Sequence, residues 1–350
     1  MFIKEEKLYC LNDISIIPAA ISEIEHRSEC NIYDKNGYLP LFTAPMLNVV
    51  GLDSYEKYKE NKIYPIIPRT APLEDRLELC KHTWCAFGLE EFIAYFVKKI
   101  ETNTQLFGLQ HLVLIDIANG NMKKLIDSIK ESKERNGHYV TIMAGNIANP
   151  QTYKLLAEAG ADYVRCSVGT GSACITASNT SVFYPTASLI HECFELKQRY
   201  NLTAKIIMDG GMKNYSDIIK SLALGADYVM CGGLFNKMVE ASGDIMEEYG
   251  NVVPQEYVIE KFKEKNFYRS FFGMSTKTAQ IAMGKTTLHT SEGKYMRNKI
   301  EYTMQGWTEN FTDYLRSCMS YCNVKNIENF NPVYVNTQVI SHNSSNSFNK

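Results

Sequence analysis

One cysteine lies in a loop whose composition suits nucleophilic chemistry. Cys174 ends the segment Gly169-Thr170-Gly171-Ser172-Ala173-Cys174, and Thr176 follows two residues later. Successive backbone N–H groups in such a loop can lower the pKa of a thiol, and small neighbours let a substrate approach it. Thr176 could relay a proton within the same loop. Cys174 is therefore the candidate nucleophile, and a buried loop cysteine without chemistry is the alternative.

Other polar and glycine-rich residues directly follow apolar runs of the sequence. They are segment 116–120 (DIANG), Gly145-Asn146, Asp209-Gly210-Gly211 and Gly232-Gly233. The Asp209 carboxylate could hold ribose hydroxyls, and paired glycines after a strand suit a phosphate site. Together these residues predict a nucleotide cradle, which a binding protein without catalysis could use as well as an enzyme.

Short apolar runs rich in valine and isoleucine could position these residues. Eight such runs start 20 to 41 residues apart, which leaves room for one helix and two loops between each pair. Near-continuous apolar strands that alternate with helices imply a parallel sheet, and eight such units close into a (β/α)₈ TIM barrel. The runs are 40–46, 64–68, 84–89, 111–117, 139–144, 163–168, 204–208 and 228–231.

An open, doubly wound sheet is the alternative architecture. The segment 169–174 resembles a dinucleotide-binding fingerprint, but Cys174 stands where its third glycine belongs, and the segment follows the sixth strand and not the first. The barrel is therefore favoured. Its active site should lie at the C-terminal ends of the strands, where all the residues named above are expected.

Composition and charge exclude several classes of protein. The chain has 350 residues, 45% of them hydrophobic, and 37 Lys+Arg against 39 Asp+Glu, so it can form a large core but has no general field for nucleic acid or anionic membranes. No run approaches the roughly 18 apolar residues of a membrane span. The first ten residues include Lys4, Glu5, Glu6 and Lys7, unlike a secretory signal. We expect a cytoplasmic protein with neither a nucleic-acid nor a membrane partner.

The cysteines and the C-terminal residues complete this first interpretation. Ten cysteines without a CxxC pair, in a chain without a secretory signal, predict nine reduced core thiols besides Cys174. Residues 1–340 are expected to form a single TIM-barrel domain. Residues 341–350, mostly serine and asparagine, are expected to form a disordered tail.

The motifs resemble those of the IMP dehydrogenase/GMP reductase family. Gly145-Asn146, loop 169–176, Asp209-Gly210-Gly211, Gly232-Gly233 and Gly273-Met274-Ser275 match its motifs in order and spacing, over about residues 12–321. The resemblance implies that the cysteine attacks C2 of a purine nucleotide to form a covalent thioimidate. It also implies that a nicotinamide cofactor exchanges hydride at the same carbon.

Segment lengths favour the reductase branch, which converts GMP and NADPH into IMP and ammonia. Sixteen residues, 276–291, separate Ser275 from Glu292, and they lack the Arg-Tyr pair with which dehydrogenases of the family activate water. Fifteen residues between Pro68 and Trp84 are too few for the inserted regulatory (CBS) domain of many dehydrogenases. A dehydrogenase without that domain, or a divergent member acting on another purine nucleotide, is the alternative. An FMN-dependent barrel would share the phosphate glycines but would not need the cysteine loop.

The resemblance also assigns roles by position. Cys174 would be the nucleophile, and Thr176 with Glu292 would deliver the proton that lets ammonia leave. The nucleotide would contact Ser172, Asp209, Gly210, Gly211, Gly232, Gly233, Gly273, Met274, Ser275 and His289. The cofactor would contact Arg69, Asp116, Ala118, Asn146, Val168, Gly169, Ser317 and Ser320. Carbonyls of Gly169, Gly171 and Cys174 would bind K⁺.

Three positions depart from the family pattern. His289 stands where reductases have an arginine that contacts the guanine, Leu47-Asn48 replaces an Asp-Thr pair, and Arg69 replaces a lysine. A shorter side chain at the edge that recognises the base leaves the identity of the purine open. By resemblance alone, we also expect a homotetramer.

Overall fold

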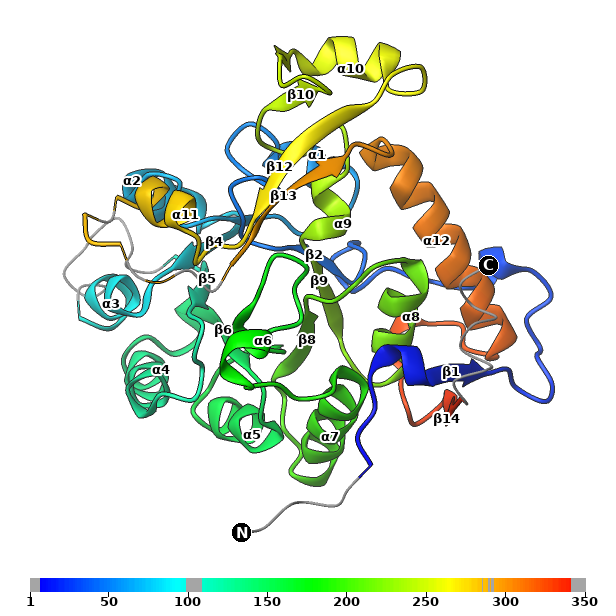
Figure 1. Ribbon diagram of the computed structural model, residues 1–350. Helices are drawn as coiled ribbons and strands as arrows, with labels where there is room; N and C mark the ends of the chain where they lie inside the picture. Colours follow the sequence, from blue (N-terminus) through cyan, green and yellow to red (C-terminus); the bar gives the residue numbers. More distant parts are fainter. Residues whose placement is uncertain (1–6, 99–108, 285, 289, 291–292, 341–350) are drawn as a thin grey trace.

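A closed barrel of eight parallel strands forms the centre of the molecule (Figure 1). The computed structural model describes residues 7–98, 109–284, 286–288, 290 and 293–340. Within the sheet the order is β2-β9-β8-β7-β6-β5-β4-β3, and a parallel bridge between Phe42 and Tyr64 joins its two edges. The strands are β2 (Leu41–Thr43), β3 (Ile66–Ile67), β4 (Trp84–Phe87), β5 (His111–Asp116), β6 (Val140–Ile147), β7 (Tyr163–Cys166), β8 (Lys205–Asp209) and β9 (Tyr228–Cys231).

All eight predicted strands are present, so the prediction of a (β/α)₈ barrel is confirmed and the open sheet is excluded. The edges close because the Thr43 N–H donates to the Tyr64 carbonyl at 2.9 Å and the Tyr64 N–H donates to the Leu41 carbonyl at 3.0 Å. Closure matters for the site because it brings the C-terminal ends of all eight strands to one rim.

Helices surround the barrel and begin at clear sequence signals (Figure 1). The Asn149 side chain accepts from the Gln151 N–H where α5 begins, and the Asn214 side chain accepts from the Asp217 N–H where α8 begins. The helices of the barrel region are α1 (Tyr55–Glu60), α2 (Leu73–Leu79), α3 (Leu89–Phe92), α4 (Lys123–Asn136), α5 (Pro150–Glu158), α6 (Thr176–Thr180), α7 (Thr186–Arg199), α8 (Tyr215–Ala223) and α9 (Gly233–Asn236). Short turns of helix are η1 (Leu11–Asp13), η2 (Arg27–Glu29), η3 (Ile93–Val97), η4 (Gly137–Tyr139) and η5 (Ile327–Asn329).

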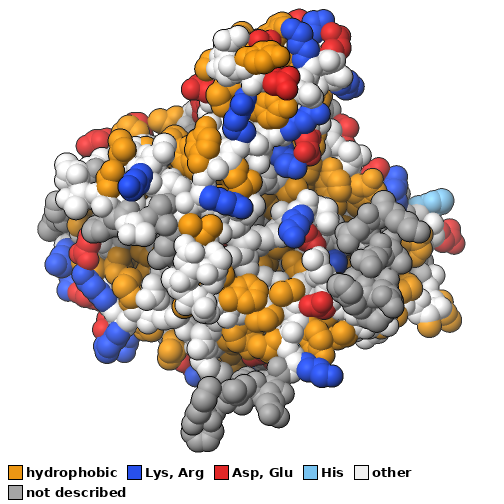
Figure 2. Space-filling model, in the orientation of Figure 1, with side chains coloured by type: hydrophobic (Ala, Val, Ile, Leu, Met, Phe, Trp, Pro, Cys, Tyr) orange, Lys and Arg blue, Asp and Glu red, His pale blue; other side chains and the backbone are white. Residues whose placement is uncertain are grey.

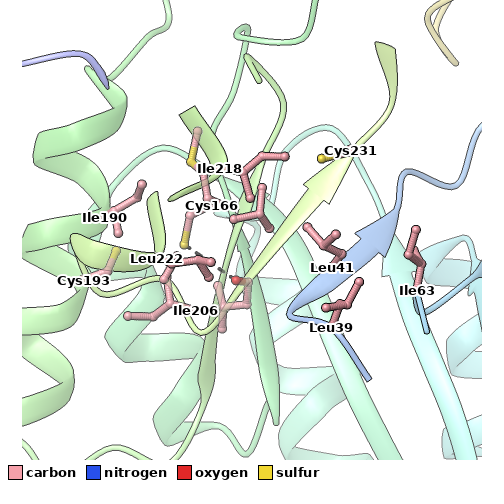
Figure 3. Packing of buried hydrophobic residues seen from close by; sticks show 14 of the residues in the cluster. Leu39, Leu41, Ile63, Cys166, Ile190, Cys193, Ile206, Ile218, Leu222 and Cys231 are labelled. Atoms are coloured by element: carbon pink, nitrogen blue, oxygen red, sulfur yellow. Dashed lines mark hydrogen bonds between the residues drawn. The ribbon is translucent and has the colours of Figure 1, made fainter. Parts of the chain in front are cut away.

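Two layers of apolar side chains hold the strands in place. One fills the barrel interior, where Phe42, Trp84 and Met230 pack together. The other lies between strands and helices, and Figure 3 shows part of it, with Ile206 of β8 and Cys231 of β9 near Ile218 of α8. All ten cysteines are free thiols. Of the nine predicted as reduced core thiols, seven are buried, while Cys10 and Cys318 are partly exposed.

Further elements extend beyond the barrel, and the sequence indicated them only as a segment that follows it. An antiparallel sheet of β10 (Ile245–Glu247), β11 (Val252–Val253), β12 (Phe267–Phe272) and β13 (Tyr295–Lys299) projects from the barrel together with α10 (Gln255–Lys261) (Figure 1). The helix α11 (Lys277–Ala282) follows β12. The helix α12 (Met304–Tyr321) precedes β14 (Asn336–Val339), which pairs with β1 (Ile14–Ile17).

No helix within the described residues is long and apolar enough to cross a membrane. The predicted tail, residues 341–350, lies outside the described residues.

Candidate active site

The cysteine loop lies between β7 and α6, on the rim formed by the C-terminal ends of the strands (Figure 1). The Cys174 thiol is half-buried and donates a hydrogen bond to the Thr176 hydroxyl, with Sγ and Oγ1 3.2 Å apart. The loop is tightened by the Cys174 N–H, which donates to the Gly171 carbonyl at 2.9 Å. The two residues predicted to share proton-transfer chemistry are therefore in direct contact.

The segment next to the predicted acid, Glu292, pairs with the cysteine loop. Cys174 and Gly293 form an antiparallel bridge, and the Lys294 N–H donates to the Ala173 carbonyl at 2.9 Å. Glu292 itself and the predicted base contact His289 lie outside the described residues. The neighbour of Glu292 in the chain thus lies beside the nucleophile.

Close approaches of glycines bring the predicted nucleotide-binding segments together around the cysteine loop. A Cβ atom at Gly233 would lie 2.9 Å from the Ser172 Oγ, and one at Gly273 would lie 3.0 Å from the Ala173 carbonyl oxygen. A Cβ atom at Gly210 would lie 3.1 Å from the Gly171 nitrogen. Any side chain at these positions would crowd the loop, which gives these glycines a packing purpose. The predicted residues at or against the loop are Ser172, Asp209, Gly210, Gly211, Gly233 and Gly273, and Gly232, Met274 and Ser275 adjoin them in the chain.

Beside the cysteine loop, two of the predicted aspartates share one buried arginine that the sequence analysis did not select. Arg165 of β7 is 5% exposed. Its Nη1 donates to Asp116 Oδ1 at 2.7 Å, and its Nη2 donates to Asp209 Oδ2 at 2.8 Å. Burial alone would lower the pKa of the Arg165 guanidinium, but Asp209 and Asp116 raise it above its ordinary value. Arg165 therefore stays charged.

A third side chain completes this cluster. The Asn146 Nδ2 donates to Asp209 Oδ2 at 2.6 Å and to the Ser167 carbonyl at 3.0 Å. Asn146, predicted as a cofactor contact, therefore orients the predicted ribose carboxylate. The signal for Arg165 was present in the sequence: it is a single charged residue within an otherwise apolar run, and burial of a charge requires partners.

Arg69, another predicted cofactor contact, extends the cluster at the end of β3. Its Nη1 lies 3.3 Å from the Asp116 carbonyl oxygen. The Arg69 Nε and the Thr70 Oγ1 are buried without a hydrogen-bond partner among the described residues. Buried donors of this kind fit a polar ligand or an ordered water. Of the other predicted cofactor contacts, Ala118 is exposed, and Val168 and Gly169 are partly buried on the same rim.

Charged side chains of both signs lie on the face seen in Figure 2. Several basic side chains lie between the projecting sheet and the centre of this face, with acidic side chains among them.

Two predicted cofactor contacts, Ser317 and Ser320, lie elsewhere. They are in the last turns of α12, where the Ser320 Oγ donates to the Ser317 carbonyl and the Ser22 Oγ donates to the Ser320 carbonyl at 2.7 Å. Figure 1 shows this end of α12 beside β1, away from α6. The structure does not join these serines to the rim, and their role as cofactor contacts stays a prediction.

Metal ligands are not gathered at the rim. No group of three or more His, Cys, Asp or Glu side chains in the described part of the chain could hold a metal ion. The predicted K⁺ ligands are backbone carbonyls, and one of them, that of Gly171, already accepts the Cys174 N–H. K⁺ binding stays a prediction.

The fold and the rim define the protein as a (β/α)₈ barrel whose C-terminal face carries a cysteine loop and, around it, the glycine-rich segments predicted to bind a nucleotide. Comparison with known proteins identifies the family. The model of the IMP dehydrogenase / GMP reductase domain matches residues 98–347, and the chain belongs to this family. The resemblance seen in the sequence motifs is confirmed.

Similar proteins of known name are GMP reductases. The chain is 31% identical to the GMP reductase of Caenorhabditis elegans over 227 residues, which cover 64% of this chain and 58% of the relative. It is 33% identical to GMP reductase 1 of Mus musculus over 213 residues, covering 60% and 55%. It is 32% identical to GMP reductase 1 of Homo sapiens over 291 residues, covering 81% and 78%. The matched segment thus spans little more than half the length of the first two relatives.

Proposed function

We propose that the protein is a GMP reductase, which converts GMP and NADPH into IMP, ammonia and NADP⁺. The observation that carries this proposal is the contact of 3.2 Å between the Cys174 thiol and the Thr176 hydroxyl, inside a ring of nucleotide-binding segments. The names of the similar proteins support the same reaction. So does segment 276–291, which lacks the arginine and tyrosine that the hydrolytic step of a dehydrogenase uses.

In this proposal the Cys174 thiolate attacks C2 of the purine. A C–S bond forms, the bond from C2 to the exocyclic nitrogen breaks, and that nitrogen leaves as ammonia once it is protonated. An amine is a poor leaving group until it gains a proton, so Thr176 and Glu292 serve as the proton-delivering pair. Thr176 contacts the thiol directly, and Glu292 adjoins Gly293, which pairs with Cys174.

The nucleotide is held by the segments around the cysteine loop. Asp209 accepts hydrogen bonds from the ribose hydroxyls, oriented by Arg165 and Asn146. Backbone N–H groups of Gly232 and Gly233 bind the phosphate together with Ser172. Further contacts in this proposal are Gly210, Gly211, Gly273, Met274, Ser275 and His289.

NADPH, when bound, supplies the hydride that adds to C2 and allows the thiolate to leave. The residues present fit such a group, because the Arg69 Nε and the Thr70 Oγ1 are buried donors without a partner in the described chain. In this proposal Asp116, Ala118, Asn146, Val168 and Gly169 contact the cofactor at the rim. Ser317 and Ser320, which lie away from the rim, contact the far end of the cofactor. We also propose K⁺ at the carbonyls of Gly169, Gly171 and Cys174, and a homotetramer located in the cytoplasm.

A second candidate reaction is favoured by one position. His289, in place of the arginine that contacts guanine in reductases, makes a different purine nucleotide, or oxidation of IMP, the alternative. The test is to mix the purified protein with GMP and NADPH, and separately with IMP and NAD⁺, and to follow the absorbance of the reduced cofactor. We expect GMP-dependent loss of NADPH with one ammonia released per NADPH. Formation of NADH from IMP, without loss of NADPH in the first mixture, would contradict the proposal.

A further inference from the structure

Arg165 is more deeply buried than the two carboxylates that it holds. Its side chain is 6% exposed, against 17% for Asp116 and 14% for Asp209. The proposed function gives Asp116 to the cofactor and Asp209 to the nucleotide. One guanidinium thus lies between two binding sites, with a carboxylate of each site on its two terminal nitrogens.

The strand register builds this arrangement. Asp116 of β5 is in register with Gly145 of β6, and Gly145 is in register with Arg165 of β7. A Cβ atom at Gly145 would lie 2.7 Å from the Arg165 Cβ. The glycine in the middle strand therefore leaves the space through which Arg165 crosses to Asp116. No other amino acid at position 145 would allow this crossing without movement of the strands.

The two ends of the cluster are held differently. Asp209 Oδ2 accepts from both Arg165 and Asn146, whereas the Asp116 carboxylate has Arg165 as its only side-chain partner among the described residues. The guanidinium is planar, so its two nitrogens move together. A nucleotide that draws Asp209 towards its ribose hydroxyls therefore shifts the guanidinium, and the guanidinium shifts Asp116 on the cofactor side.

We propose that Arg165 is a positioning residue that couples the binding of the nucleotide to the binding of the nicotinamide cofactor. The coupling is positive, because the first ligand bears the cost of shifting the shared guanidinium and the second ligand then meets a carboxylate already in place. It is also reciprocal, so each ligand strengthens the binding of the other by the same factor. This inference rests on the proposed function.

The test uses IMP and NADPH. They cannot exchange hydride, because IMP already has a hydrogen at C2 and NADPH is the reduced form of the cofactor. The Kd of IMP is measured by calorimetry on the full chain, with and without saturating NADPH. The ratio of interest is the Kd of IMP without NADPH divided by the Kd of IMP with NADPH. Couplings between sites are typically 5- to 150-fold, and we expect this ratio to be at least about 5 for the wild type. For Arg165→Lys we expect a ratio near 1 with both ligands still binding, because one ammonium keeps the charge but cannot fix two carboxylates in one plane.

Two further variants separate coupling from damage to the fold. Asp116→Asn keeps the shape of the side chain and removes one end of the bridge, so its ratio should also fall towards 1. Lys197→Arg is the matched control. The Lys197 side chain is 14% exposed and its Nζ donates to both carboxylate oxygens of Asp227. Asp227 directly precedes β9, at the end of the barrel opposite the rim, so this replacement should leave the ratio unchanged.

The outcomes distinguish this inference from the proposed function. A wild-type ratio near 1, with both ligands bound, overturns the coupling and leaves the proposed function standing. A ratio that persists in Arg165→Lys and Asp116→Asn also overturns it, as does an equal loss in Lys197→Arg. Failure of the wild type to bind IMP or NADPH at all contradicts the proposed function, and the coupling falls with it.

Discussion

Replacement of Gly233 by alanine tests the phosphate side of the nucleotide site. The new Cβ atom would lie 2.9 Å from the Ser172 Oγ and 3.7 Å from the Phe271 ring. The ring tolerates ordinary contact, but the hydroxyl has to turn away. The variant should therefore fold normally and lose the hydrogen bond from Ser172 to the phosphate. A hydrogen bond to a charged group contributes about 1.5–3 kcal/mol, so the Kd of GMP should rise roughly 10- to 100-fold.

Calorimetry with GMP and with guanosine isolates this effect. Guanosine lacks the phosphate, so its Kd should be the same in Gly233→Ala as in the wild type. Because the loss acts through Ser172, the double variant Gly233→Ala/Ser172→Ala should bind GMP no more weakly than Ser172→Ala alone. Additive losses in the double variant, or an equal loss of guanosine binding, would refute the reasoning.

Three further predictions concern the acid, the backbone and pH. Glu292→Gln should lower steady-state turnover of GMP about 10²- to 10⁴-fold with little change in the Kd of GMP or NADPH; wild-type turnover would rule out its role as proton donor. Gly225 has φ of +108°, and a Cβ atom there would lie 2.5 Å from the Phe194 ring, so urea unfolding of Gly225→Ala should show a loss of at least about 2 kcal/mol in the free energy of unfolding. Gly250 has φ of +92° and open space around it, so Gly250→Ala should lose about 1 kcal/mol. Equal losses of stability in the two variants would contradict the predicted clash with Phe194. Burial lowers the pKa of His111, so the unfolded state binds its proton more readily and stability should fall as pH drops below about 6.5. His111→Gln should flatten this fall in Tm, and an unchanged slope would exclude His111 as its source.

The barrel could be predicted from the sequence because each of its strands is buried on both faces and therefore forms a continuous apolar run. Val113, Ile142 and Val229, from three of those runs, are fully buried. Parallel strands place their C-terminal ends together, so the glycines and aspartates that follow these runs had to meet at one rim. The contact between Cys174 and Thr176 followed from their separation of two residues.

The Arg165 bridge could not be predicted in the same way. Its partners Asp116 and Asp209 are 49 and 44 residues away in the chain, and only the register of the four strands from β5 to β8 brings them together. The projecting sheet was missed because its strands do not form continuous apolar runs. In β13, exposed and partly buried residues alternate, so no apolar run marks it. Ser317 and Ser320 were assigned by resemblance alone, and the course of α12 takes them away from the rim.

The covalent role of Cys174 is decided by the initial rate of GMP-dependent NADPH oxidation in Cys174→Ala, at GMP concentrations shown by calorimetry to saturate the variant. The thiol donates one hydrogen bond, to Thr176, and is half-buried, so its removal should leave the fold and the nucleotide cradle intact. Since only a thiolate adds to C2 at neutral pH, the rate should fall to the background of the assay. A variant that keeps more than a few per cent of the wild-type rate would show that the reaction does not pass through a bond to Cys174.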